Sequence, residues 1–337
     1  MIWIVKLKNS IVYAIKRVLE SGKPTARENK LLERIATLEK VTSSLQKTIN
    51  KTNRAQSSEI KRLAIGARIN GQLLVQQIGL NQGAENNYPS ELNAYEAQVY
   101  SQNGEDGILL ALFERIGTTN KTFVEIGAGG LENNTNNLFF NYGWQGLWVD
   151  MDQGCMDSLQ SYVARNFEAR LDDAKIVVTK VTRDNINQII ADNCSVAEPD
   201  LLTIDVDGND AHLLRALEVV RPRVLMVEYN ASFGLSPVTV PYDPDFNRHK
   251  YHSFYHGASA SALTRIAESK GYRLVCCDTE GVNTVFVRND VLNSKLKMLT
   301  AQEAFMPERR RTRKYTAAQQ WDFVKEFALE TVDGMAV

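Results

Sequence analysis

Apolar runs alternate with helical stretches through the middle of the chain, and this alternation limits the fold more than any other feature. The runs with strand character cover 122–127, 146–150, 175–181, 200–206 and 222–229. Strands that alternate with helices form parallel sheets covered on both faces, so the pattern predicts a doubly wound α/β fold. Two further runs, "YRLVCCD" and "NTVFVR", follow a helical stretch at about 258–270. Only four residues separate them, too few for a parallel crossover, so we expect these last two strands to be antiparallel.

The first strand leads into a glycine-rich turn, "TFVEIGAGGLENNT" (122–135). Ligands of open α/β sheets bind beyond the carboxyl ends of the strands, where glycine lets them approach the backbone. Gly127 and Gly129 supply such a turn, but Glu132 stands where a dinucleotide fingerprint has its third small residue. Glu125 would repel a pyrophosphate and attract the sulfonium and ammonium groups of S-adenosylmethionine (SAM). The turn therefore favours SAM over NAD.

Acidic residues end the second and fourth strands. Asp150 in "GLWVDMD" lies where an acid can accept hydrogen bonds from both ribose hydroxyls of an adenosyl group, and Asp152 is the weaker alternative. The fourth strand is followed by Asp205, Asp207 and Asp210. Like charges this close raise one another's pKa unless donors or a cation intervene. We expect Asp210 to cap the next helix.

The fifth strand ends in "VLMVEYN", which places Glu228 and Asn230 beside Asp207. Oxygen atoms from neighbouring strand ends are the ligands that Mg²⁺ prefers. Asp207 and Glu228 are therefore candidate Mg²⁺ ligands. The alternative is a hydrogen-bonded polar cluster that positions a substrate.

Several of these segments, in this order, resemble the FkbM-like SAM-dependent methyltransferases of the class I superfamily. The resemblance covers about residues 95–292 and rests on "YSQNGEDGILLALFERIG", "FVEIGAGGLENNTNNL", "GWQGLWVDMD", "DLLTIDVDGNDAHLLRAL", "RVLMVEYN" and "ALTRIAESKGYRLVCCDTEGVNTVFVR". It implies a mostly parallel, seven-stranded sheet with an antiparallel last strand. It also implies an enzyme that methylates hydroxyl groups, often those of sugars in glycans or natural products.

The resemblance also assigns cofactor-binding residues. It places Glu125, Gly127 and Gly129 around the methionine part of SAM and Asp150 on the ribose. It places Thr182, just after the third strand, on the adenine side of SAM.

Two more segments gain a role from the same resemblance. The resemblance places Asp205 next to the methionine part of the cofactor. "SQNGED" resembles an entry segment, in which Gln102 and Glu105 close over the cofactor. The alternative is a helix cap formed by Ser101 or Asn103.

Methyl transfer to a sugar hydroxyl needs a base or a metal, because the neutral hydroxyl is a poor nucleophile. Three of the four histidines lie in "RHKYHSFYHGAS" (248–259), where a substrate loop is expected. His256 is our first candidate for the general base and His252 the second, with Asp207 and Glu228 as further candidate catalytic residues. The alternative is an exposed polar loop. Zinc is disfavoured, since no thiolate lies nearby in the sequence.

The N-terminal part differs from the rest in charge. Residues 1–80 hold 15 Lys/Arg against 5 Asp/Glu, whereas the remainder holds 24 against 35. Residues 1–22 predict a basic amphipathic helix that docks either on a membrane surface or on its own protein, too interrupted by lysine and arginine to span a bilayer. Heptad spacing over 23–80 predicts a coiled coil and a homo-oligomer; the alternative is a single helix lying on the globular domain. Residues 81–98 read as a linker.

The predicted methyltransferase domain covers 99–295, and a basic extension with a helix covers 296–337. Its run "ERRRTRKY" (308–315) carries five Arg/Lys, but the domain is acidic and no aromatic platform accompanies the run. A solvated or lipid-facing segment is therefore favoured over nucleic-acid binding. Four cysteines without a disulfide framework favour a cytoplasmic location, with contact to the inner face of the membrane as an option.

Two functions remain open from the sequence. The first is a SAM-dependent methyltransferase that O-methylates a sugar hydroxyl of a surface glycan or another saccharide. The second is a non-catalytic, cofactor-binding scaffold that acts through its coiled coil and its membrane-surface helix.

Overall fold

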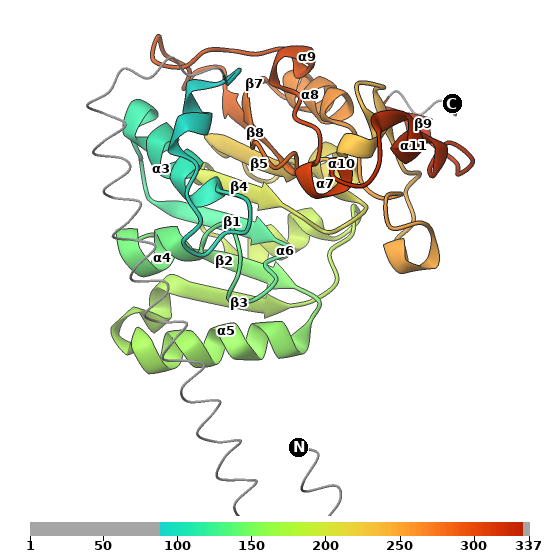
Figure 1. Ribbon diagram of the computed structural model, residues 1–337. Coiled ribbons are helices and arrows are strands. Elements are labelled where there is room, and N and C mark those ends of the chain that lie inside the picture. The colour runs from blue at the N-terminus through green and yellow to red at the C-terminus, as the bar shows by residue number, and fades with distance from the viewer. Residues whose placement is uncertain (1–87, 333–337) are drawn as a thin grey trace, which may run out of the picture. The chain divides into compact units, whose positions relative to one another are not determined.

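The computed structural model describes residues 88–332 (Figure 1). The predicted amphipathic helix (1–22), the coiled coil (23–80) and the first part of the linker (81–87) lie outside the described residues. The short helix η1 (Glu91–Tyr95) lies within the predicted linker and buries Leu92. Asn93 Nδ2 donates a hydrogen bond to the backbone oxygen of Cys277 at 2.8 Å. Residues 91–95, within the stretch predicted as a linker, therefore pack on the domain.

One seven-stranded sheet has the order β3-β2-β1-β4-β5-β8-β7 (Figure 1). All neighbouring strands pair in parallel except β8, which is antiparallel to both β5 and β7. The strands are β1 (Thr122–Ile126), β2 (Gln145–Asp150), β3 (Ala174–Val178), β4 (Leu201–Ile204), β5 (Val224–Glu228), β7 (Tyr272–Cys277) and β8 (Asn283–Arg288). The structure confirms the mostly parallel sheet and the antiparallel pairing of the last two strands.

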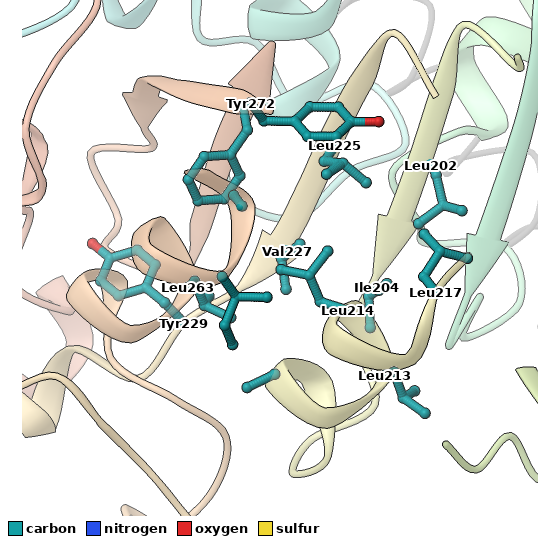
Figure 2. Close-up of a cluster of buried hydrophobic side chains, with 14 of the residues drawn as sticks. Leu202, Ile204, Leu213, Leu214, Leu217, Leu225, Val227, Tyr229, Leu263 and Tyr272 are labelled. Atoms are coloured by element: carbon teal, nitrogen blue, oxygen red, sulfur yellow. The ribbon is translucent and has the colours of Figure 1, made fainter. Parts of the chain in front are cut away.

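Helices cover both faces of this sheet, which confirms the doubly wound arrangement. One face carries α3 (Glu105–Ile116), α4 (Asn136–Tyr142) and α5 (Gln153–Asn166). The other carries α6 (Ile186–Asn193), α7 (Asp210–Ala216) and α8 (Ala260–Ser269). Side chains of β1 alternate between them, since Val124 and Ile126 pack toward α7 and α8 while Phe123 packs on Trp148. Figure 2 shows the core on the face of α6, α7 and α8, where Leu214 of α7 lies against Ile204 of β4 and Val227 of β5.

The segment after β8 packs on the domain and forms a second, two-stranded sheet. There β6 (Val238–Thr239) pairs with β9 (Glu330–Thr331) in antiparallel fashion. We call residues 296–332 the C-terminal segment; Val324 and Leu329 of this segment are buried beside Phe233. The remaining helical elements are α9 (Ala301–Ala304), α10 (Arg309–Thr312), α11 (Ala317–Asp322), η2 (Glu168–Asp173), η3 (Ala231–Phe233) and η4 (Arg248–Lys250). The helix predicted in this segment appears as α11, shorter than its sequence pattern.

Two further features concern the helices and the cysteines. Among residues 88–332, no helix is long and apolar enough to cross a membrane. All four cysteines are free thiols, and Cys276 and Cys277 point into opposite cores of the sheet.

A buried carboxylate ties the amino ends of the central strands together. Asp200, just before β4, accepts hydrogen bonds from the backbone amides of Thr119, Asn120 and Lys121 at 2.7 to 3.0 Å. Arg223, just before β5, donates to the same carboxylate at 2.7 Å. Burial alone would raise the pKa of Asp200, but these hydrogen bonds lower it below its ordinary value.

Asp200→Asn is expected to lower the free energy of unfolding by about 3 kcal/mol at neutral pH, because Arg223 is left as a buried charge without its partner. A lowered pKa in the folded state means that this stabilisation is complete above the ordinary aspartate pKa of about 3.9 and is lost as pH falls below it. Denaturant unfolding at pH 7 and in acid measures both effects. Asp172→Asn, at an exposed acid, serves as the control. Equal losses from the two variants at pH 7 would contradict the assignment.

Candidate active site

The glycine turn after β1 packs directly on the end of β4. Gly127 has a φ of +85°, and a Cβ placed there would lie only 1.6 Å from the backbone oxygen of Asp205. The Asp205 amide in turn donates to the backbone oxygen of Ile126 at 2.9 Å. Only glycine satisfies both the left-handed backbone and the close approach. The ends of β1 and β4 are therefore held in contact at this point.

Asp150 joins the same turn from the end of β2. Its Oδ2 accepts a hydrogen bond from the Gly129 amide at 2.9 Å, and its Oδ1 accepts one from the Asp152 amide at 2.8 Å. Asp152 caps α5 by accepting from the Cys155 amide at 2.9 Å. The structure thus brings together Gly127, Gly129 and Asp150, the residues predicted to hold an adenosyl cofactor, and gives Asp152 a structural role.

Glu125 lies under the turn and is 1% exposed. One oxygen accepts from the Asn134 amide at 2.9 Å, and the other accepts from the Thr135 hydroxyl. Trp148 Nε1 donates to the Thr135 hydroxyl oxygen at 2.9 Å. Burial raises the pKa of Glu125 to about 8, against the effect of these donors. Glu125 therefore anchors the loop after the glycines to the sheet, and its predicted contact with the cofactor stays a prediction.

Thr182 and Gln102, the other predicted cofactor neighbours, lie in loops. The Thr182 amide donates to Asn185 Oδ1 at 2.7 Å in the turn between β3 and α6. Gln102 is exposed, and its backbone oxygen accepts from the Gln98 side chain at 2.7 Å. Their roles toward a cofactor stay predictions.

Two buried acids organise the "SQNGED" segment. Asp106 Oδ2 accepts from the backbone amides of 99, 100 and 101 at 2.7 to 2.8 Å, and Ser101 Oγ accepts from the Asp106 amide at 3.1 Å. Glu105 Oε1 accepts from Asn283 Nδ2 at 2.6 Å, which ties the segment to the start of β8. The N-cap position of α3 is Gly104, without a side-chain cap. The N-cap is thus neither Ser101 nor Asn103, the two predicted candidates. The predicted contact of Glu105 with a cofactor stays a prediction.

Four carboxylates and one imidazole gather where β4 and β5 end. Ligand atoms of Asp205, Asp210 and Glu228 lie within 4.8 Å of one another, and so do those of Asp207, Glu228 and His256. Burial raises the pKa of both Asp205 and Glu228 well above their ordinary values, and the neighbouring carboxylates raise them further. We call these five residues the acidic cluster. The structure thus assembles all three predicted catalytic residues, Asp207, Glu228 and His256.

Two members of the acidic cluster already have strong partners. Asp210 accepts from the amides of Val206 and Gly208 at 2.8 and 2.9 Å, so it closes the loop ahead of α7. The predicted capping role is wrong in detail, because the N-cap of α7 is Asn209. Asp207 has a left-handed backbone (φ +57°), and its exposed carboxylate pairs with Arg248.

Asn230 holds the histidine loop instead of facing a cation. Its Nδ2 donates to the backbone oxygens of Phe254 and His256 at 2.6 and 2.7 Å. Its Oδ1 accepts from Arg311 Nη1 at 2.8 Å and from the Ser232 amide at 3.0 Å. The side chain at the end of β5 therefore positions residues 254–256.

Of the three histidines in this loop, only His256 is buried. His256 Nε2 lies 3.0 Å from Arg311 Nη2, and its Nδ1 lies 4.0 Å from Glu228 Oε2. Burial, followed by the charges of Arg311 and Arg248, lowers the pKa of His256 well below its ordinary value. His252 stacks on Phe323 at 4.6 Å between ring centroids, and His249 is exposed. Among the described residues, no three-ligand group includes either of them.

Arg311 is the residue of this site that sequence reasoning missed. Its side chain is only 18% exposed, whereas Arg309, Arg310, Arg313 and Lys314 in the same basic run are exposed. Nothing in "ERRRTRKY" distinguishes one arginine from the others. The contact depends on Asn230, 81 residues earlier.

Comparisons with known proteins add a fold likeness. No protein-family model matches the sequence, and no curated protein matches it. Similar solved structures include the methyltransferase domain of bacterial CtHen1-C, with 17% identity and a TM-score of 0.36 over 56% of this chain and 99% of that chain. The O-methyltransferase TomG from Streptomyces achromogenes, in complex with SAM, has 16% identity and a TM-score of 0.36 over 64% of this chain and 95% of its own.

A third similar structure is the N-terminal domain of EvdMO1 with SAH bound, with 12% identity and a TM-score of 0.36 over 56% of this chain and 81% of that one. With identities and scores this low, the likeness carries no argument about the reaction.

Proposed function

We propose that the chain is a SAM-dependent methyltransferase that O-methylates a sugar hydroxyl of a surface glycan or another saccharide. The observation that carries the proposal is the hydrogen bond from the Gly129 amide to Asp150, which joins the glycine turn and a strand-end acid at the edge that also holds the acidic cluster. Ligands of open α/β sheets bind at this edge. The resemblance of the ordered segments to FkbM-like methyltransferases supports the same assignment.

The residues at this edge fit SAM. Gly127 lets the turn pack on the end of β4, and a Cβ at Gly129 would meet only the Glu132 backbone oxygen at 3.6 Å, so the backbone at Gly129 is open to a ligand. The carboxylate of Asp150 has lone pairs beyond the two that accept backbone amides, and these suit ribose hydroxyls. The acidic cluster attracts the positive sulfonium and ammonium groups.

Within this proposal, Glu228 is the general base that accepts the proton of the acceptor hydroxyl. When bound, SAM supplies an electrophilic methyl group on sulfur: the acceptor oxygen forms the new O–C bond as the S–C bond breaks, and a neutral thioether leaves. Glu228 takes the hydroxyl proton, and its raised pKa makes the ionised carboxylate a stronger base. Asp205, beside Glu228 and next to the turn, would lie on the methionine side of SAM, where its carboxylate would attract the sulfonium.

Arg248 and Arg311, rather than Mg²⁺, balance the acidic cluster in this proposal. Of the predicted cation ligands, Asp207 is paired with Arg248, and the Asn230 oxygen is taken by Arg311 and a backbone amide. Among Asp207, Glu228 and Asn230, only Glu228 keeps an oxygen that is buried and has no hydrogen-bond partner among residues 88–332. A cation held by Asp207 and Glu228 is the second candidate.

Metal dependence separates these two arrangements. Methyl transfer by protein treated with EDTA and then freed of the chelate is expected to stay within about twofold of the untreated rate, because arginine side chains cannot be chelated away. Readdition of Mg²⁺ should change nothing. A loss of activity that Mg²⁺ restores would assign the carboxylates to a metal.

Calorimetry with SAM and with its demethylated product, followed by radiolabelled methyl transfer to saccharide extracts, tests the proposed function. Binding with transfer supports the enzyme. Binding without transfer to any saccharide favours the cofactor-binding scaffold, which would act through residues 1–80. We further propose homo-oligomerisation through 23–80 and peripheral contact of 1–22 with the inner membrane face, both from sequence alone.

A further inference from the structure

We propose that Arg311 of the C-terminal segment fixes the tautomer of His256, so that His256 and Glu228 together hold the acceptor hydroxyl as a donor and acceptor pair. This inference rests on the proposed function and deepens it. It makes Arg311 a positioning residue, His256 a hydrogen-bond donor and Glu228 the proton acceptor.

The tautomer follows from the chemistry of the guanidinium group. Arginine has only N–H donors, so His256 Nε2, 3.0 Å from Arg311 Nη2, must be the acceptor in that hydrogen bond. A neutral imidazole carries one proton. Since Nε2 accepts, the proton of His256 is on Nδ1.

Arg311 is held in place from several sides. Nη1 donates to Asn230 Oδ1 and to Ser232 Oγ, both at 2.8 Å. Nε lies 2.8 Å from Glu308 Oε2, and the guanidinium carbon lies 4.7 Å from the centre of the Phe254 ring. These contacts fix the direction of the donor that faces His256, so the tautomer is a property of the folded chain.

The histidine itself is fixed by the same asparagine. Asn230 Nδ2 donates to the backbone oxygen of His256 at 2.7 Å, while Asn230 Oδ1 accepts from Arg311. One side chain at the end of β5 therefore sets the position of both partners. Glu228, two residues earlier, starts from the same strand end.

The distance between His256 and Glu228 fits one hydroxyl group. His256 Nδ1 and Glu228 Oε2 are both buried, both lack a partner among the described residues, and lie 4.0 Å apart. This is too far for a direct hydrogen bond. An oxygen about 2.8 Å from each atom would accept from Nδ1–H and donate to Oε2, with an angle of roughly 90° at the oxygen. A hydroxyl can do both, whereas an ether has no proton for Glu228.

The exposed ion pair between Asp207 and Arg248 lies over this buried pair. Asp207 lies within the same 4.8 Å group as Glu228 and His256, and its side chain is 57% exposed. Exposed ion pairs contribute only about 0–1 kcal/mol, so opening this one costs an incoming saccharide little. We place the entry of the acceptor hydroxyl there.

This tautomer is incompatible with the general-base role that the sequence predicts for His256. A His256 ring with Nε2 bonded to Arg311 and a proton on Nδ1 has no lone pair to accept a proton from a substrate. The general-base role predicted for His256 would need Arg311 to leave. With Arg311 in place, the proton goes to Glu228.

Nitrogen-15 NMR of the full chain with labelled histidine tests the tautomer without any substrate, and His256→Gln identifies the signal. We expect a neutral ring with its proton on Nδ1 from pH 6 to 8. In Arg311→Met we expect the proton to move to Nε2 and the ring to titrate closer to the ordinary histidine pKa of about 6.5. Arg311→Lys, which keeps a charged donor, should retain the Nδ1 proton; Arg310→Met, at an exposed neighbour, is the control. A wild-type ring protonated on Nε2 overturns the proposal.

The second part of the proposal, that His256 and Glu228 hold the acceptor hydroxyl, is tested by the rate of methyl transfer. Arg311→Met should lower kcat at least about tenfold, through loss of one hydrogen bond to the acceptor, while Arg311→Lys retains most of it and SAM binding is unchanged. Equal rates in wild type and Arg311→Met would overturn the role of the pair. If the wild type transfers no methyl group but shows the Nδ1 proton, the proposed function and the hydroxyl role fail together, and the tautomer assignment stands.

Discussion

Glu228→Gln is expected to lower the rate of methyl transfer by about 10²- to 10⁴-fold without loss of SAM binding. The amide keeps the shape of the carboxylate and a hydrogen-bonding oxygen, but it cannot take a proton. In the wild type the rate should rise with pH through the raised pKa of Glu228 and then level off. The variant should lack this rise. Steady-state rates between pH 5 and 9 measure both effects.

Glu228→Gln is expected to leave the protein at least as stable as the wild type, so unfolding would not explain the loss of activity. Because the pKa of Glu228 is raised in the folded state, ionised Glu228 costs stability as pH rises above the ordinary glutamate value. Glu228→Gln should therefore unfold at an equal or higher denaturant concentration at pH 8, and like wild type in acid. Glu218→Gln, at an exposed acid, is the control for both measurements. An inactive Glu228→Gln protein that is also less stable would not support the assignment.

Gly127→Ala is the second substitution with a large expected effect. Its new Cβ would meet the Asp205 backbone oxygen at 1.6 Å, so β1 and β4 must move apart. The strained backbone and the overlap together should lower the free energy of unfolding by about 2–5 kcal/mol. A displacement of about 1 Å at a reacting site costs on the order of 100-fold in rate. Denaturant unfolding measures the loss of stability, the rate of methyl transfer measures the loss of activity, and calorimetry measures any loss of affinity for SAM.

Gly143→Ala provides a matched control for this clash. Gly143 also has a left-handed backbone (φ +70°), but a Cβ there meets no atom within 4 Å among the described residues. In this variant the free energy of unfolding should fall only by the cost of a left-handed backbone, about 1–2 kcal/mol, and the affinity for SAM should be unchanged. Equal losses in the two variants would mean that backbone strain, and not the contact between β1 and β4, explains the requirement for glycine at 127.

The strands were predictable because each apolar run ends where a charged or turn residue begins. The run ending at Asp150 matches the observed end of β2, and the run 222–229 extends one residue past the end of β5 at Glu228. The glycine turn could be placed as well, because it follows the first such run. In an open sheet, strand ends determine which residues meet, so the acidic cluster followed from the alternation of strands and helices.

The partners of these residues could not be predicted, because they depend on contacts without local signals. The sequence predicts a cofactor contact for Glu125, but it gives no local sign that the Glu125 oxygens also accept hydrogen bonds from Asn134 and Thr135. The strands β6 and β9 are two residues long, too short for any periodicity. Arg311 reaches the site through the packing of the whole C-terminal segment.

That segment makes the chemistry of His256 depend on residues that follow the sheet in the sequence. The strands of the seven-stranded sheet, the glycine turn and the carboxylates all precede residue 296, whereas the donor that faces His256 Nε2 comes after it. A chain shortened after β8 would keep the sequence of the sheet and of the acidic cluster but would lack Arg311. Nothing would then hold His256 Nε2 as an acceptor. Residues 296–332 are thus part of the site, although they add no strand to the seven-stranded sheet.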